Sequence, residues 1–460
     1  MLFNSYAFLL VFLPVAIVLA RMADPYPALR MPVLIGLSLA FYGYGDPPFL
    51  LLLIASITGN WLAARLFARF KVKGILTCAI IANLALLGLF KYADFAVANL
   101  DLLIGHGFQP LQLALPLGIS FFTFHHIMYL TDLRAGKAPL TALDRYALYI
   151  AFFPQAIAGP LARWSEVMEQ FGQRIYAPGW QQRFFLGIVF IVGGLIEKIM
   201  FGDRIAHLLD PIYAQAATGP LPAGDAWLAA FVSVQIFYDF AGYSDIAIGL
   251  GLLFGVRLPF NFDAPLRATN MQDFWQRWHM TLMAFLRDYV FRPMVNARVL
   301  PRRLFAVQYF AAMLITMVLC GLWHGASWSF VLWGTLHGVA VVVCALWRRF
   351  GPRLPAVLGW LLTFLVVLGT GVIFRAGSVE AAWHVFQGLA SLPPVERGVR
   401  LLPIVIPTLA AVLLPASQDV AARLTRRPNV GLAVLLGVAV LALLIELGER
   451  DVHEFIYFKF

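Results

Sequence analysis

The sequence predicts an all-α polytopic membrane protein, on the strength of its composition and its long apolar runs. Hydrophobic residues make up 61% of the 460 residues, and charged residues only 13%. Soluble domains carry about 45–50% apolar and roughly 25% charged residues. A soluble fold has too little interior to hide the apolar excess found here. The same composition excludes a disordered chain, a collagen-like chain and a disulfide-rich secreted domain.

Apolar runs of nearly membrane-spanning length recur along the whole chain. Because a span needs about 20 largely apolar residues, and several runs are too short or too polar to cross alone, we expect about 11 membrane helices plus re-entrant or interfacial helices. The first run is followed by a poor signal-peptidase site, so we expect it to be retained. No repeat or low-complexity tract divides the chain, which predicts a single integral-membrane domain over 1–460. The candidate spans are 6–21, 31–44, 48–64, 74–92, 111–130, 146–160, 184–201, 226–255, 305–322, 327–347, 355–374, 401–416 and 430–447.

The chain has a net charge of +10, and the positions of its basic residues predict how it is oriented in the membrane. Cytoplasmic loops of membrane proteins are enriched in Lys and Arg. Basic clusters lie at 65–73, after the third predicted span, and at 298–303 and 348–353. The last two clusters bracket two predicted spans, so both can lie on the cytoplasmic side together with the first.

The three cysteines predict neither a disulfide framework nor a metal site. Cys78, Cys320 and Cys344 are widely separated, lie in apolar runs and form no CxxC pair. Free cysteines in such positions usually pack as small hydrophobic side chains. We therefore expect no metal site and no resident cofactor.

A polar stretch from Arg257 to Arg303 carries eight arginines together with tryptophans and a histidine. Within it, Asn270 resembles a helix cap, with an acid three residues later. The helix is expected to continue to Tyr289, with Trp275, His279, Leu282 and Leu286 on one face. Asp273 and Arg277 have the i, i+4 spacing of a stabilising ion pair. Two interpretations remain open: an interfacial helix whose arginines and tryptophans hold lipid headgroups, or part of a reactive site.

His324 is the sharpest functional candidate from the residues themselves. It stands in Gly321-Leu322-Trp323-His324-Gly325, between two strongly apolar runs, where the glycines predict a helix interruption. Ionisable residues at membrane depth are commonly functional. A neutral imidazole can take a proton from a hydroxyl near pH 7. The alternative is a histidine that is hydrogen-bonded between helices.

Other polar residues inside apolar runs carry weaker signals. Glu197 and Lys198 are expected to form a neighbouring ion pair, and the long 226–255 run is expected to break near 241–243, between Asp239 and Asp245. His125 and His126 diverge by about 100° on a helix and cannot form an i, i+4 metal pair. They are expected in the core or in a tunnel wall, and His337 as a packed helix residue.

The last six residues are Phe-Ile-Tyr-Phe-Lys-Phe, an aromatic end to a chain that has just left an apolar run. The simplest interpretation is an interfacial anchor. Tyr457 could instead reach into a site as a nucleophile, provided that a base deprotonates its phenol, whose pKa is near 10.

Taken together, these motifs resemble the membrane-bound O-acyltransferase (MBOAT) family, in the bacterial branch of the alginate O-acetyltransferase membrane subunits. The branch also includes peptidoglycan O-acetyltransferases and the D-alanyl transfer proteins of teichoic acids. The resemblance runs through most of the chain. It rests on Phe152-Phe153-Pro154 with Gly159-Pro160, Tyr243-Ser244-Asp245, Leu258-Pro259-Phe260-Asn261-Phe262, Asp273-Phe274-Trp275-Gln276-Arg277-Trp278-His279, Leu286-Arg287-Asp288-Tyr289 and Gly321-Leu322-Trp323-His324-Gly325.

The resemblance implies a fold and a set of site residues. The fold would be many helices around a central tunnel that joins the two membrane faces. His324 matches the catalytic histidine of the family, His279 its second polar residue, and Tyr457 an acyl relay in the aromatic tail. The substrate and tunnel residues implied by the matching motifs are Trp323, Trp275, Trp278, Arg277, Arg287 and Asp288. His125-His126 and Lys459 depart from the family pattern, which shows glutamine there.

The implied function is transfer of an acyl group, chiefly acetyl, across the bacterial inner membrane to an extracytoplasmic polysaccharide. The donor would be acetyl-coenzyme A or an acyl-carrier thioester on the cytoplasmic side, and a periplasmic acetyltransferase would receive the acyl group. Membrane lipid surrounds the chain, and no nucleic-acid partner is expected. Two alternatives remain: transfer of D-alanine or another acyl group from a carrier protein, and a glycan or lipid-precursor transporter. A transporter predicts repeated halves with paired broken helices, which the sequence does not show.

Overall fold

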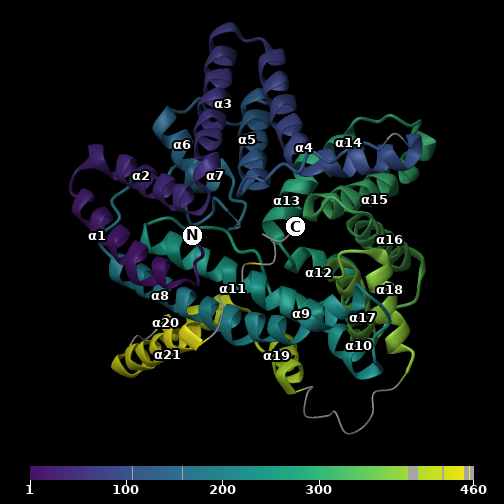
Figure 1. Ribbon diagram of the computed structural model, residues 1–460. Coiled ribbons are helices and arrows are strands. Elements are labelled where there is room, and N and C mark those ends of the chain that lie inside the picture. The colour runs from purple at the N-terminus through teal and green to yellow at the C-terminus, as the bar shows by residue number, and fades with distance from the viewer. Residues whose placement is uncertain (106, 158, 392–401, 427–428, 450–454, 456–460) are drawn as a thin grey trace. The chain divides into compact units, whose positions relative to one another are not determined.

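The computed structural model describes the chain except for residues 106, 158, 392–401, 427–428, 450–454 and 456–460. All regular elements within the described residues are helices, which confirms the all-α prediction (Figure 1). The chain divides into two compact units. One comprises residues 1–195, 243–260 and 421–454, and the other comprises 196–242, 261–420 and 455–460. A single domain over 1–460 stays a prediction.

The first unit contains the N-terminal helices. Its long hairpin, α3 and α4, turns where Lys71 adopts a left-handed conformation (φ 57°), and α4 ends at Gly105 (φ 71°). Left-handed residues are common helix stops because they redirect the chain while their amides bond back to carbonyls of the last turn, here those of Phe67 and Asp101. The helices of this unit are α1 (Leu13–Ala23), α2 (Pro27–Gly45), α3 (Leu50–Phe70), α4 (Lys73–Ile104), α5 (Ile119–Arg134), α6 (Leu143–Ala151), α7 (Trp164–Val167), α8 (Trp180–Leu195) and α21 (Val430–Glu449), with the short helices η1 (Ala7–Phe12) and η2 (Pro47–Phe49).

The second unit contains the polar stretch and the helices that follow it. Helix α11 (Val232–Leu253) begins in this unit and continues into the first. The other long helices are α9 (Arg204–Ala216), α15 (Phe305–His324), α16 (Trp328–Phe350), α17 (Ala356–Arg375), α18 (Val379–Leu389) and α19 (Leu402–Leu413). The shorter ones are η3 (Ile196–Asp203), α10 (Ala223–Ala229), η4 (Pro265–Arg267), α12 (Met271–Arg277), α13 (Met280–Leu286), η5 (Arg287–Phe291), α14 (Arg292–Asn296) and η6 (Arg302–Leu304). Helix α20 (Ser417–Thr425) begins in this unit and ends in the first.

Fewer helices have the length and apolarity of a membrane span than the sequence predicts. Within the described residues, 8 helices are long and apolar enough to cross a membrane, or up to 9 if the bent pair α19–α20 counts as one span. The apolar helix over Ala7–Ala23 covers the first candidate run but is shorter than the roughly 20 residues that cross a membrane.

Helices α15 and α16 form a tight antiparallel hairpin, in which they lie side by side (Figure 1). Glycines allow this closeness: a Cβ on Gly321 would overlap the carbonyl of Phe330, and one on Gly334 would overlap that of Met317. Small residues at helix contacts are the usual means of close packing in membranes, where apolar burial alone gives no driving force between helices. The hairpin places Arg302 and Arg303, which precede α15, and Arg348 and Arg349 of α16 at one end and His324 at the other.

Two expectations about polar residues in the spans are wrong, one about an ion pair and one about a helix break. Lys198 Nζ lies 2.5 Å from Oδ1 of Asp203 and 2.5 Å from Oδ1 of Asp239, so its partners are these aspartates, and the expected pair with Glu197 is wrong. Helix α11 runs unbroken through 241–243, so the expected break there is also wrong. The interruption lies earlier, at 230–231, between α10 and α11.

The helix expected from Asn270 to Tyr289 begins as predicted but does not continue. The Asn270 side chain accepts a hydrogen bond from the Asp273 amide (2.9 Å), and Arg277 Nε donates to Asp273 Oδ1 (2.7 Å). The helix then breaks at His279, whose φ is 42°, between α12 and α13. The single face predicted to join Trp275 to Leu286 is therefore wrong, because residues on the two sides of the break belong to different helices.

Candidate functional site

His324 lies at the end of α15, inside a ring of aromatic side chains. The helix stops because Gly325 is extended, and a Cβ there would overlap the Phe330 ring. The imidazole is 3% exposed. Its ring centre lies 4.7 Å from that of Trp323, 5.1 Å from that of Trp333 and 5.0 Å from that of Phe374. The predicted interruption of the apolar run at this motif is confirmed, and it presents the imidazole at a helix terminus.

A small cavity of about 40 Å³ adjoins His324. A buried site needs about 10–15 Å³ to hold one water molecule, so this cavity accommodates water but not an acyl thioester. A thioester can therefore reach the imidazole only when lining side chains move. The lining residues come from α11, α12, α15, α16 and α17: Ser233, Ile236, Phe274, Trp275, Trp278, His324, Trp333, His337, Val367, Thr370, Gly371 and Phe374.

His279 occupies the break between α12 and α13 in a left-handed conformation (φ 42°, ψ 52°). Such a conformation is uncommon for a residue other than glycine, and residues held in it cluster at functional sites. The break follows from backbone pairing with an extended segment: the Asp263 amide donates to the Arg277 carbonyl (3.0 Å), and the Met280 amide donates to the Asn261 carbonyl (2.9 Å). These bonds take the place of helical ones on both sides of His279.

Asn261 also contacts the imidazole of His279 and determines its tautomer. His279 Nδ1 lies 3.3 Å from Asn261 Oδ1, which also accepts a hydrogen bond from Thr281 Oγ1 (2.6 Å). A carbonyl oxygen cannot donate, so Nδ1 carries the proton and Nε2 keeps its lone pair. Burial lowers the pKa of His279 to about 3, since the charged form loses its solvation, and the ring is neutral at pH 7. Nε2 has no hydrogen-bond partner among the described residues.

Aromatic rings connect the two histidines. Trp323, the neighbour of His324, has its ring centre 5.8 Å from that of His279. On its other side the His279 ring meets Phe240 edge-on, at 4.6 Å. Both histidines therefore belong to one buried cluster, in which low polarity strengthens the interaction between any two charges.

A larger groove of about 1400 Å³ lies between α16 and α17. One end is lined by Arg348 and Arg353, and the other by Thr370, which also lines the cavity at His324. From Ala356 to Thr370 the groove follows about 14 residues of α17, or roughly 20 Å at 1.5 Å per residue. It links the basic end of the α15–α16 hairpin to the neighbourhood of the imidazole.

The other predicted site residues fall into two groups. Trp275 and Trp278 line the cavity with His324, and Trp323 lies against both histidines. Three charged residues do not line this cavity. Arg277 is paired with Asp273 and Asp263, and Arg287 donates to both carboxylate oxygens of Asp288 (2.9 and 3.0 Å). Within the described residues no group of three or more His, Cys, Asp or Glu side chains is arranged to hold a metal ion.

Tyr457 lies outside the described residues. Phe455, two positions earlier, is described and is 1% exposed. Its ring centre lies 5.4 Å from that of Phe240, which itself contacts His279. The chain therefore approaches the histidine cluster just before its aromatic end.

The sequence patterns missed several residues of the site. His337, expected only as a packed residue, is buried and lines the cavity with His324. Its ring is tilted against that of Trp333 (centres 4.5 Å apart) and meets that of Trp275 edge-on (5.1 Å). His337 is 13 positions after His324, a spacing with no meaning until α15 and α16 fold back on each other. His125 and His126 are in the core, as expected: His126 contacts Ser56 Oγ (3.0 Å) and Tyr146 Oη (2.6 Å).

Comparisons with known proteins show which family this chain resembles. The model of MBOAT, the membrane-bound O-acyltransferase family, matches residues 140–374. A peptidoglycan O-acetyltransferase of Helicobacter pylori is 35% identical over 434 residues, covering 86% of this chain and 81% of its own. A probable alginate O-acetylase AlgI of Pseudomonas aeruginosa is 36% identical over 404 residues, covering 85% and 75%. A teichoic acid D-alanyltransferase of Bacillus subtilis is 30% identical over 243 residues, covering 52% and 60%.

Proposed function

The chain belongs to the membrane-bound O-acyltransferase family and is an acyltransferase, and we propose that it moves an acetyl group from a cytoplasmic thioester to an extracytoplasmic polysaccharide. The observation that carries the proposal is the placement of His324. It lies in a buried aromatic cavity whose wall residue Thr370 also belongs to a long groove with a basic end. This arrangement suits a donor whose charged part stays outside while its reactive end reaches the imidazole.

His324 is the proposed general base. It takes the proton from the attacking hydroxyl as that oxygen bonds to the thioester carbonyl carbon. The carbon–sulfur bond then breaks, and the imidazolium returns the proton to the departing thiolate. The route in which the imidazole itself carries the acyl group uses the same geometry. Neutral His279, with an unprotonated Nε2, is the second polar group of the reaction.

Acetyl-coenzyme A is the proposed donor, and the groove between α16 and α17 its route. Arg348 and Arg353 form no ion pair among the described residues, so both are available to an anionic donor. By the positive-inside rule this basic end faces the cytoplasm. The roughly 20 Å from Ala356 to Thr370 requires a thioester on a long flexible arm. Three ion-paired residues remain proposed substrate contacts near the cytoplasmic mouth of the groove. They are Arg277, which pairs with Asp273 and Asp263, and Arg287 with Asp288, which pair with each other.

Tyr457 is the proposed acyl relay toward a periplasmic acetyltransferase. It follows by two positions Phe455, whose ring packs beside Phe240, a neighbour of His279. Its phenol would receive the acyl group and carry it outward as an ester. The chain would then work in the bacterial inner membrane, with the polysaccharide on the outer side.

Replacement of the histidine tests the chemistry. His324→Ala should abolish acetylation of the polymer while the protein level in the membrane stays normal, and His337→Ala, in the same cavity, is the matched control for altered packing. Full acetylation by His324→Ala would refute the role of His324. Tyr457→Phe keeps the ring and removes the hydroxyl, so unchanged polymer acetylation in that variant would reject the relay but leave the base intact.

D-alanyl transfer from a carrier protein is the second candidate, favoured by the teichoic acid D-alanyltransferases among the relatives. Purified protein can be incubated with labelled acetyl-coenzyme A or with a carrier protein charged with labelled D-alanine. We expect label on the protein or acceptor only from acetyl-coenzyme A. Label only from the carrier protein would select the second candidate.

A further inference from the structure

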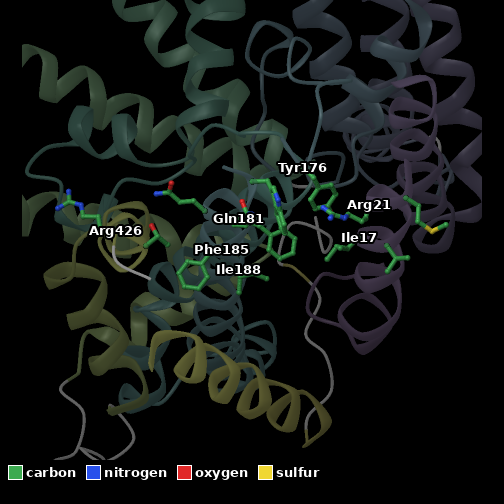
Figure 2. A pocket seen from close by; sticks show the side chains of 13 residues that line it. Ile17, Arg21, Tyr176, Gln181, Phe185, Ile188 and Arg426 are labelled. Atoms are coloured by element: carbon green, nitrogen blue, oxygen red, sulfur yellow. The ribbon is translucent and has the colours of Figure 1, made fainter. Parts of the chain in front are cut away.

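A second large groove, in the first unit, has no part in the proposed reaction. Its volume is about 1140 Å³, and α1, α8 and the end of α20 line it (Figure 2). The residues on it are Ile17, Val18, Arg21, Met22, Tyr176, Trp180, Gln181, Gln182, Phe184, Phe185, Ile188, Thr425 and Arg426. None of them is acidic.

The floor of the groove is apolar and belongs to one face of α8. Gln181, Phe184, Phe185 and Ile188 follow the i, i+3, i+4, i+7 spacing of a helix stripe. The opposite face of α8 packs inside the unit, where a Cβ on Gly187 would meet the Gly249 carbonyl at 2.8 Å. On the other wall, Val18 and Met22 of α1 remain 55% and 65% exposed. These side chains offer acyl chains a concave apolar surface.

Two arginines flank this apolar floor, Arg21 on one side and Arg426 on the other (Figure 2). Neither forms an ion pair within the described part of the chain. The guanidinium of Arg21 lies over the rings of Tyr176 (4.3 Å) and Trp180 (5.5 Å), which hold it in place without neutralising it. Tyrosine and tryptophan beside arginine are typical of the headgroup level of a membrane.

Asp24, the residue that follows α1, already has partners of its own. Asp24 accepts hydrogen bonds from the amides of Ile175 (2.6 Å) and Tyr176 (3.2 Å), and Arg174 and Arg30 lie within ion-pair distance of it. Asp24 therefore stabilises the segment that leads into α8. Arg21 keeps its positive charge for a ligand.

We propose that this groove binds an anionic phospholipid, with the phosphate at the arginines and an acyl chain along Phe185 and Ile188. The charge complementarity selects the occupant: two unpaired guanidiniums, no carboxylate on the walls and an apolar floor fit a negatively charged headgroup attached to hydrocarbon. A zwitterionic lipid would bring a second positive charge to the same arginines. Basic pockets between membrane helices bind anionic headgroups in this manner.

Native mass spectrometry of the full chain tests the proposal. The solubilised protein is titrated with phosphatidylglycerol or with phosphatidylethanolamine of the same acyl chains, and phosphatidylglycerol should bind at lower concentration. Each arginine near an anionic headgroup contributes about a five-fold gain in binding, so Arg21→Gln with Arg426→Gln should weaken phosphatidylglycerol binding roughly thirty-fold. Ile188→Trp, which fills the floor without changing charge, should also weaken it.

The matched control is the pair Arg65→Gln with Arg69→Gln. These arginines also lie over aromatic rings, Trp61 and Phe70, at 5.2 and 5.5 Å, but do not line the groove. The control should bind phosphatidylglycerol as the wild type does. Equal binding of the two lipids, equal loss in the control, or displacement of the lipid by equimolar coenzyme A would overturn the proposal.

Discussion

Asn261 Oδ1 lies 3.3 Å from Nδ1 of His279, the residue at the break between α12 and α13. The same oxygen accepts from Thr281, so both of its lone pairs are used on the segment that holds His279. This contact keeps the imidazole in the tautomer whose Nε2 can accept a proton. The amide therefore acts as a positioning group for the histidine.

Asn261→Leu should lower the acyl-transfer rate. His279 is the second polar group beside the proposed general base His324, and a positioned acid–base group contributes about 10²–10⁴-fold, so the loss of its orientation should lower the rate roughly tenfold. The kcat for acetyl transfer from acetyl-coenzyme A measures the effect. Thr281→Val is the matched control, because it removes the other hydrogen bond to the same oxygen. A wild-type rate for Asn261→Leu would contradict the assignment.

Stability should depend on pH through His279. The pKa of this residue is about 3 in the folded protein and near 6.5 in an unfolded chain, so between these values only the unfolded chain binds the proton. The contribution of neutral His279 is complete above pH 6.5 and is lost as the pH falls toward 3. The unfolding temperature in detergent should therefore drop between pH 7 and pH 5. His279→Gln should make that drop smaller, and an unchanged slope would show that His279 does not titrate.

Lys198→Met should destabilise the protein strongly. Lys198 is buried with Asp203 and Asp239, and removal of one partner from a buried ion pair costs about 3–5 kcal/mol because it leaves an uncompensated charge. Titration with sodium dodecyl sulfate in mixed micelles measures the free energy of unfolding. Asp239→Asn leaves Lys198 paired with Asp203 and should cost less. Equal losses in the two variants would show that Lys198 does not compensate the charges of both aspartates.

Gly334→Leu should separate the helices of the hairpin that carries His324. A Cβ at this position would lie 3.0 Å from the Val318 Cα and overlap the Met317 carbonyl. Overpacking of this kind costs about 1–3 kcal/mol, and it should reduce acetyl transfer as well as the unfolding temperature. Gly88→Leu, on α4, has open space at its Cβ and serves as the control. If both variants behave alike, the close approach of α15 and α16 is not required.

Gly369→Leu should obstruct the proposed donor route without disturbing the fold. Gly369 lines the groove between α16 and α17, and nothing lies within 4 Å of a Cβ placed there. The added side chain should raise the KM for acetyl-coenzyme A roughly tenfold, which corresponds to about 1.4 kcal/mol of lost binding. The unfolding temperature should stay at the wild-type value. An unchanged KM would place the donor elsewhere.

Local patterns predicted much of the fold and part of the site. The cap at Asn270 and the pair between Asp273 and Arg277 formed as expected, because they depend on residues three or four positions apart on one helix. The helix end at His324 was also predictable from its flanking glycines. The apolar runs and glycines around His324 marked it as a functional candidate, and the resemblance to the family added a role for His279.

The remaining features depend on residues far apart in the chain. The break at His279 exists because 261–263 pairs with the backbone of 277–280, and no pattern within 270–289 encodes that partner. Lys198 pairs with Asp239, 41 positions away, and not with its neighbour Glu197, because the fold brings Asp239 beside it.

The sequence alone thus established that this chain is a membrane protein built of helices. Each apolar residue favours transfer into the membrane independently of its tertiary contacts, so composition and apolar runs suffice for that conclusion. Which side chains surround His324 was decided only by the tertiary structure, because the fold-back of α16 on α15 and the packing of α17 bring together rings such as Trp333 and Phe374 that are distant along the chain.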